Sequence, residues 1–200
     1  LTCKQKIERD SVGEEIPCGI VKWFVEVFDQ ADELVAVATI LTMVQKKNPF
    51  VQLNRSNISG YLSRLTAESK PNWGIMTAQH MIEHLEKGFR MATGEISGYE
   101  IDTPEEKLAK TREMIFNYRP MPREFKHPLL PKDGLDALIH ADLEAAKSKM
   151  LEAWDTYETF FSDKPDLRTT NAVFGMMDKF EWDLLNNKHM NHHLAQFGLI

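Results

Sequence analysis

The pattern of apolar residues changes near residue 48 of this 200-residue chain, and the change limits the folds that the chain can adopt. In residues 19–47, two apolar runs flank a polar patch at residues 29–33. The first run alternates with period two, which places Lys22 and Glu26 together on one face of an extended strand. From about residue 50, apolar residues instead recur at helical spacing. We therefore predict a mainly α-helical protein that begins with β-structure.

The β-structure is predicted to be a hairpin. The second apolar run, Leu34–Val44, is rich in β-branched residues, which favour strands. Residues 29–33 are then the loop, and a single amphipathic helix from Ala31 to Lys46 is the alternative. Residues 2–9 could add one more strand. Because two or three strands leave a bare edge and little core, we expect another chain or further sequence to complete the sheet.

The helical spacing of apolar residues after residue 50 predicts four main helices and two long connections, as in a helical bundle. Thr77 can cap a helix that runs to about Thr93, and Thr103 can cap one that has Pro104 at its first position. The expected helices cover residues 54–65, 77–93, 103–117, 141–161 and 179–196, of which the one at 103–117 is short, with loops at 118–135 and 162–176. Asp178 and Glu181 form a capping box for the last helix, which ends before Gly198.

Histidines carry the only chemical pattern in the sequence. His189 and His193 lie four residues apart on the last helix, on the face that continues from Trp182 and Leu185. Two neutral imidazoles one turn apart on an inward face can bind one metal ion. His80 and His84 have the same spacing on an earlier helix, and His84 lies beside its apolar face.

These positions predict a divalent metal site formed by His84, His189 and His193, with no catalytic acid or base identified. His80 and Gln196 are candidates to orient the ligand rings through hydrogen bonds, and His192 is expected on the flank of the site. Imidazole suits Zn²⁺ and Ni²⁺ best, with Fe²⁺ and Mn²⁺ as further candidates. Three protein ligands leave positions open for water or a thiol, which is typical of catalytic sites. Ordinary hydrogen-bonded core histidines are the alternative.

Composition narrows the expected partners. The net charge of −6 argues against non-specific nucleic-acid binding, which needs clustered cations. No apolar run reaches the roughly 20 residues that span a bilayer, so we expect no membrane partner. Cys3 and Cys18 do not make a disulfide framework, and a cytoplasmic location is expected. The expected partners are a small-molecule substrate, a thiol or a CoA thioester among the candidates, and further copies of the chain in a homo-oligomer.

Residues 50–200 resemble the DinB/YfiT-like superfamily of metal-binding four-helix bundles. The resemblance lies in the stretch from Trp73 to Leu85 and in the pattern HxxHHxxQFG at residues 189–198. It implies that His84, His189 and His193 hold a divalent metal, and that the activity is metal-dependent hydrolysis or thiol transfer. Members of this subgroup often have His-Pro before Phe-Gly in the final loop. Here Asn171-Ala172-Val173 precedes Phe174-Gly175, so the contribution of that loop to the pocket differs.

Residues 1–47 resemble the C-terminal strands of a MaoC-like hot-dog hydratase domain. The matching segments are residues 1–4, 19–28 and 40–44. The likeness is to the hydratase end of the bifunctional ring-opening enzymes of phenylacetate degradation, which join an aldehyde dehydrogenase to an oxepin-CoA hydrolase. It implies that the chain is the tail of a longer polypeptide, with the Asp/His dyad of the hydratase upstream. In that case the helical part is either a metal-dependent enzyme or a non-catalytic accessory or oligomerisation domain.

Overall fold

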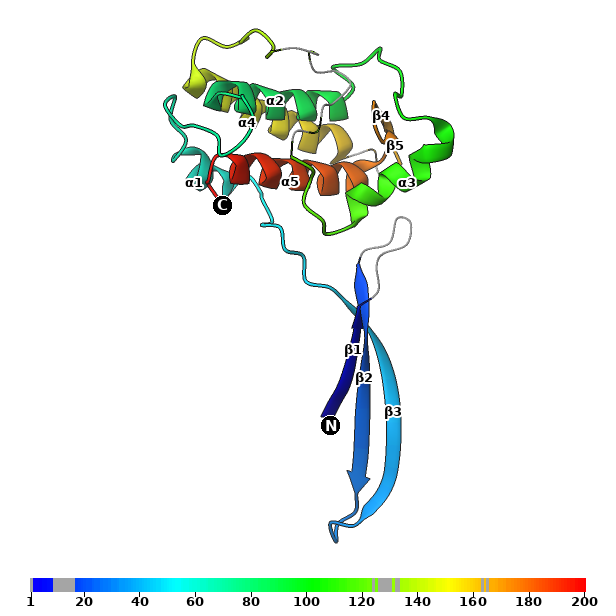
Figure 1. Ribbon diagram of the computed structural model, residues 1–200. Helices are drawn as coiled ribbons and strands as arrows, with labels where there is room; N and C mark the ends of the chain where they lie inside the picture. Colours follow the sequence, from blue (N-terminus) through cyan, green and yellow to red (C-terminus); the bar gives the residue numbers. More distant parts are fainter. Residues whose placement is uncertain are drawn as a thin grey trace.

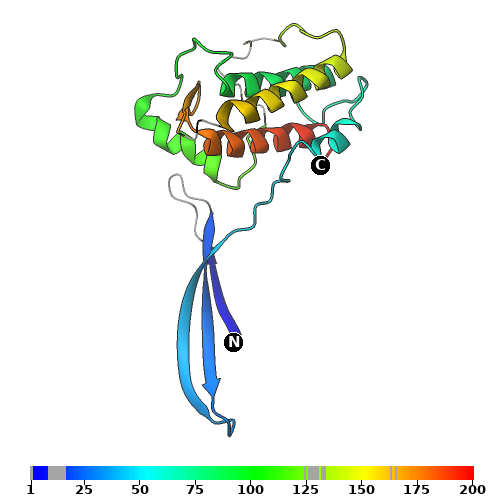
Figure 2. The same cartoon turned by 180° about the vertical axis from the view of Figure 1, so that it is seen from behind.

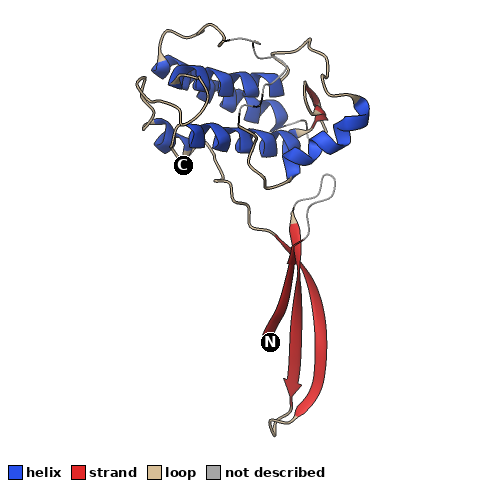
Figure 3. Ribbon diagram, in the orientation of Figure 1, coloured by secondary structure: helices blue, strands red, loops and turns tan. Residues whose placement is uncertain are grey.

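A computed structural model describes residues 2–8, 17–123, 125, 131, 134–162, 164 and 166–200, with only the backbone for residues 2–8. A long three-stranded sheet projects from a compact helical part, to which an extended linker joins it (Figures 1 and 2). Figure 3 shows this division into strands and helices along the chain. The change of pattern near residue 48 therefore marks the change of architecture. None of the helices among the described residues combines the length and apolarity needed to cross a bilayer.

The sheet has the order β1-β2-β3 and is antiparallel throughout. Its strands are β1 (Thr2–Glu8), β2 (Cys18–Phe28) and β3 (Leu34–Gln45), which confirms the predicted hairpin and third strand and excludes a helix over residues 31–46. The carboxylate of Asp29 shapes the loop, because it accepts hydrogen bonds from the backbone N–H groups of Ala31 and Glu33. Residue 9, the predicted end of the first strand, lies outside the described residues.

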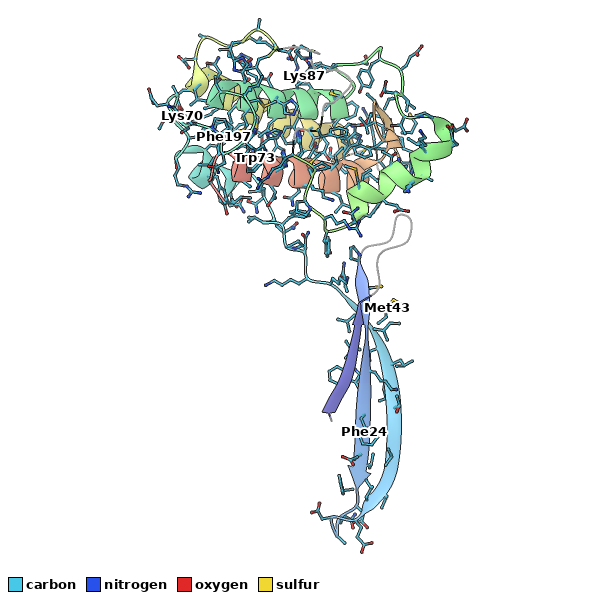
Figure 4. All side chains as sticks on the ribbon, in the orientation of Figure 1. Phe24, Met43, Lys70, Trp73, Lys87 and Phe197 are labelled. Carbon is cyan, nitrogen blue, oxygen red and sulfur yellow. The ribbon has the colours of Figure 1, made fainter. Side chains whose placement is uncertain are left out.

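The side chains of the β2–β3 hairpin are largely exposed to solvent. Every residue of β3 is exposed, and β2 is at most half-buried. Figure 4 shows side chains, including the labelled Phe24 and Met43, standing out from the sheet with no helix over them. The large exposed apolar residues of β3 are Leu34, Val35, Val37, Ile40, Leu41, Met43 and Val44. This exposure agrees with the expectation that something else must complete the sheet.

The described residues contain five helices. They are α1 (Ile58–Leu62), α2 (Ala78–Ala92), α3 (Glu105–Phe116), α4 (Leu143–Ser162) and α5 (Lys179–Gln196). The hydrophobic core is formed by buried residues between Ile58 and Leu199 and includes none of the described side chains of β2 and β3. At its centre, Phe89 of α2 stacks on Trp154 of α4 with ring centroids 5.2 Å apart, and Tyr157 packs 5.6 Å away. The helical part therefore has a core of its own.

Three local predictions are wrong. The helix predicted over residues 54–65 is only one turn long, because the Asn54 side chain accepts from the N–H groups of Ser56 and Asn57 and holds a turn there. Thr103 does not cap α3, which begins at Glu105 and whose N-cap residue, Pro104, makes no side-chain cap hydrogen bond. The loop predicted at residues 162–176 contains a small hairpin, β4 (Thr169–Asn171) and β5 (Gly175–Met177).

The small hairpin ties the helices together. Thr169 Oγ1 donates to the carbonyl of Ala92 at the end of α2 and accepts from Trp182 Nε1 of α5. Arg112 of α3 donates to the Phe174 and Met176 carbonyls and to the Glu181 carboxylate, forming a buried ion pair. The hairpin thus fixes the ends of α2, α3 and α5 opposite to the end where the histidines lie.

Candidate metal centre

The last helix supplies two of the predicted ligands. Its start is fixed by the predicted capping box, in which Asp178 accepts from the N–H of Glu181 and Glu181 accepts from the N–H of Asp178. Its end is fixed by Gly198, whose φ of +65° lies in the left-handed region that glycine adopts easily. Between these ends, the rings of His189 and His193 lie 4.7 Å apart on the inward face. The predicted pairing of these two residues is confirmed.

The α2 helix supplies the third ligand. Thr77 caps α2 as predicted, accepting a hydrogen bond from the N–H of His80. One turn further along α2, the His84 side chain contacts α5. His84 Nε2 lies 2.9 Å from His189 Nε2, which in turn lies 3.0 Å from His193 Nε2. All three ligand atoms lie within 4.8 Å of one another. The fold therefore brings together three imidazoles that are up to 109 residues apart in the sequence.

Two of the three separations between these nitrogens fit one bound cation. Zinc–imidazole bonds are about 2.0–2.1 Å long, so two nitrogens on one ion lie about 2.8–3.4 Å apart at angles of 90–110°. The two observed separations fall in this range. Nitrogen lone pairs at such distances repel one another unless a proton or a cation lies between them. His84 and His189 are half-buried and His193 is buried, so the cluster is open on one side.

Gln196 fixes the protonation pattern of His193. Its side-chain Nε2 donates to the Trp73 carbonyl at 2.8 Å, so its Oε1 faces His193 Nδ1, also at 2.8 Å. An oxygen there accepts, so Nδ1 carries the proton and the Nε2 lone pair faces the cluster. Burial lowers the pKa of His193 to about 4, more than the Gln196 hydrogen bond raises it, so the ring is neutral at pH 7. This arrangement matches the orienting role predicted for Gln196.

The turn before α2 is built around Gln196. Gly74 has a φ of +76°, and a Cβ atom at this position would lie 3.0 Å from Gln196 Nε2. Any other residue would be strained and would press on the amide that orients His193. The turn at Gly74 therefore leaves the space in which the Gln196 amide orients His193.

His80 does not join the cluster. Its Nδ1 lies 2.6 Å from Thr77 Oγ1, and its Nε2 lies 3.2 Å from the carbonyl of Asp136. Both ring nitrogens are thus occupied by the start of α2 and by the segment before α4. The structure brings His84 to the other two histidines and leaves His80 apart, so the hydrogen bonds of His80 do not match the orienting role predicted for it.

A second group of residues on α2 was not predicted from the sequence. The Glu83 carboxylate accepts hydrogen bonds from the N–H groups of Ile139 and His140, and Glu86 pairs with the His140 ring at 2.6 Å. Burial alone would raise the pKa of Glu83, but these N–H groups and Gln79 together lower it below its ordinary value. The segment before α4 is thereby tied to the helix that carries His84. No sequence pattern relates these residues, since the pairs are more than fifty positions apart.

One rim of the cluster is aromatic and cationic. The His192 ring lies edge-on to His193, with centroids 5.0 Å apart, and edge-on to Trp73 at 5.6 Å. Arg123 lies over the other part of this rim, with its Cζ atom 4.2 Å from the Trp73 ring centroid. Burial and the charge of Arg123 lower the pKa of His192. His192 thus lies on the flank of the cluster, as predicted.

A cavity of about 270 Å³ lies elsewhere, between the linker, α3 and α5, and includes Phe50, Tyr118 and Lys188 but none of the three histidines. Lys188 points into this region, where burial lowers its pKa to about 8 and its ammonium donates to the carbonyls of Met114 and Asn117. The side chain of Lys188 therefore anchors α3 to α5 and takes no part in the cluster.

Comparison with known proteins finds no match among protein families, curated proteins or solved structures.

Proposed function

We propose that the helical part is a DinB-like four-helix bundle that binds a divalent metal ion through His84, His189 and His193. The observation that carries the proposal is the convergence of three Nε2 atoms from two helices within 4.8 Å. The neutral state of His193 and the orientation that Gln196 imposes on its ring support it further. Zn²⁺ and Ni²⁺ suit three imidazoles best.

The activity that we propose is metal-dependent hydrolysis or thiol transfer on a small molecule. A divalent ion supplies Lewis acidity to a water molecule or thiol at its open positions. The chain's own contribution is to orient the ligands: α5 presents two rings from one face, and Gln196 keeps the lone pair of His193 directed inward. The half-buried His84 and His189 leave one side of the cluster accessible to a substrate.

Metal analysis tests this proposal. Protein purified without a histidine tag is expected to contain about one equivalent of divalent metal by mass spectrometry. His189→Ala removes the nitrogen that lies between the other two and should lose most of that metal. His192→Ala is the matched control, because it removes a ring from the same helix that lies only on the flank. A wild-type metal content near zero, or equal content in His189→Ala and wild type, would count against the proposal.

The bare sheet favours a second proposal for residues 1–47. These strands would be the closing part of a MaoC-like hot-dog sheet, in a protein of the phenylacetate ring-opening type. The support is the row of exposed apolar side chains on β3, which a longer sheet and its covering helix would bury. The helical part would then be an accessory or oligomerisation domain in such a protein. The coding sequence upstream of Leu1 tests this, because a stop codon followed by a start site near Leu1 would refute it.

Chelation separates the two roles of the helical part. If the histidines hold a metal, EDTA should lower the melting temperature, since a ligand that binds only the folded state stabilises it by mass action. If the histidines are ordinary core residues of an accessory domain, EDTA should leave the melting temperature unchanged.

A further inference from the structure

Arg123 lies beside Trp73 at the rim of the histidine cluster. Its guanidinium stacks over the Trp73 ring at 4.2 Å, which is within the range of a cation–π contact. The residue is exposed, and it forms no hydrogen bond or ion pair with the residues that the structure describes. This contact holds the guanidinium against the indole ring and leaves its N–H groups without acceptors among the described residues. Such an arrangement is ready to bind a planar or tetrahedral oxyanion.

Trp73 connects this cation to the proposed ligands. Its carbonyl accepts from Gln196, which orients His193, and its ring meets His192, which in turn meets His193. The guanidinium is therefore separated from the histidine cluster by only two aromatic rings. A small molecule with one group at the cluster can reach Arg123 with another.

The indole of Trp73 adds an unused donor. Its Nε1 atom is buried and has no hydrogen-bond acceptor among the residues that the structure describes. An unsatisfied buried N–H destabilises the folded state, and an acceptor brought by a ligand would relieve that cost. A cation and an unsatisfied donor thus meet at one residue beside the cluster.

We propose that Arg123 and Trp73 form the anion-recognition part of this site, so that its substrates carry a negatively charged oxygen group in addition to the group that reaches the histidines. Carboxylates and phosphates share this chemistry. The inference rests on the proposed function for the reacting end of the substrate, but binding of the anion by Arg123 does not depend on the metal. An uncharged substrate of the same length would lose this contact.

Two thiols of equal chain length, one ending in a carboxylate and the other in a hydroxyl group, provide the test. Calorimetric titration of zinc-loaded protein with 6-mercaptohexanoate and with 6-mercaptohexanol measures the preference for the carboxylate. We expect the wild type to bind 6-mercaptohexanoate at least about tenfold more tightly, which is the usual effect of a charge-assisted hydrogen bond. Arg123→Gln should remove most of this preference, and the charge of the bound zinc should account for what remains. Inorganic phosphate as a competitor shows whether a phosphate can replace the carboxylate.

Lys70→Gln is the matched control, because it removes an exposed positive charge three residues before Trp73. Figure 4 shows Lys70 and Trp73 at the same end of the helical part. This variant should keep the wild-type preference. Equal binding of the two thiols by the wild type, or an undiminished preference in Arg123→Gln, would overturn the inference.

A failure of the metal proposal remains distinguishable. If the protein takes up no zinc, hexanoate is titrated into the metal-free protein, and the indole N–H resonance of Trp73 is followed after assignment with Trp73→Phe. A saturable shift in the wild type that is lost in Arg123→Gln supports the anion site without the metal. A resonance that does not move refutes it.

Discussion

Replacing Gln196 tests whether the histidine cluster is organised for ligation. Gln196 is 5% exposed, and its amide joins His193 Nδ1 to the Trp73 carbonyl through two hydrogen bonds of 2.8 Å. Gln196→Leu removes both bonds and leaves the proton on His193 Nδ1 buried without an acceptor. A buried donor left in this state costs about 1–3 kcal/mol. The metal-free variant should therefore lose about 1–3 kcal/mol in its free energy of unfolding.

The same change should weaken metal binding. Loss of a group that orients a ligating histidine lowers metal affinity about 10- to 100-fold, which equals about 1.4–2.7 kcal/mol. Bound metal adds its binding free energy to the stability of the folded state. When metal is present in excess, Gln196→Leu should therefore lose more of its free energy of unfolding, roughly 2–6 kcal/mol. Urea denaturation with and without excess metal gives the two stabilities, and competition with a chromophoric chelator gives the affinity.

Gln196→Glu separates orientation from stability. A glutamate at this position still offers an oxygen to His193 Nδ1 but can no longer donate to the Trp73 carbonyl. This variant should lose stability and keep a metal affinity close to that of the wild type. The reasoning is wrong if Gln196→Leu binds metal as tightly as the wild type, or if both variants lose affinity equally.

Three further changes test the surroundings of the site. Removing metal with EDTA should lower the melting temperature of the wild type and leave that of His189→Ala almost unchanged, as measured by differential scanning calorimetry. Gly74→Ala should weaken metal binding in chelator competition because its Cβ meets Gln196 Nε2, whereas Gly94→Ala, with a similar φ of +74° and open space, should only lose stability. Glu83→Gln should lose about 1.5–3 kcal/mol in urea denaturation, because the carboxylate accepts two backbone N–H bonds. Since the pKa of Glu83 is lowered, that wild-type advantage should be complete at pH 7 and disappear as the pH falls below the usual range for glutamate.

The last helix and its histidines could be predicted because their determinants are local. The capping box at Asp178 and the glycine at position 198 fix both ends of α5 within the sequence itself. Once the ends are known, the four-residue spacing puts His189 and His193 on one face. The position of His84 beside the apolar face of its helix favours it over His80 as the third ligand. The structure agrees, because His84 Nε2 meets His189 Nε2 while His80 turns to Thr77 and Asp136.

The remaining features depend on contacts between distant segments. The β4–β5 hairpin has only three residues in each strand, which is too short for an alternating pattern, and its turn is held by the Asn171 side chain. The stacking of Arg123 on Trp73 joins positions fifty residues apart. The prediction that Thr103 caps α3 is wrong for a different reason. The local residues allow such a cap, but the folded chain does not form it. Composition and spacing contain no information on such pairs.

The charge of the proposed centre agrees with the proposed substrate. Within the described residues, the group that could hold a metal contains three histidines and no carboxylate. Neutral ligands leave the full charge of a divalent ion uncompensated in a partly buried position, where its field is weakly screened. Arg123 adds a further positive charge beside it. In a chain with a net charge of −6, a divalent ion bound beside Arg123 would create positive potential at this site, which would favour a negatively charged substrate over a neutral one of equal size. On this reasoning, the affinity for 6-mercaptohexanoate should fall with added salt, whereas that for 6-mercaptohexanol should not.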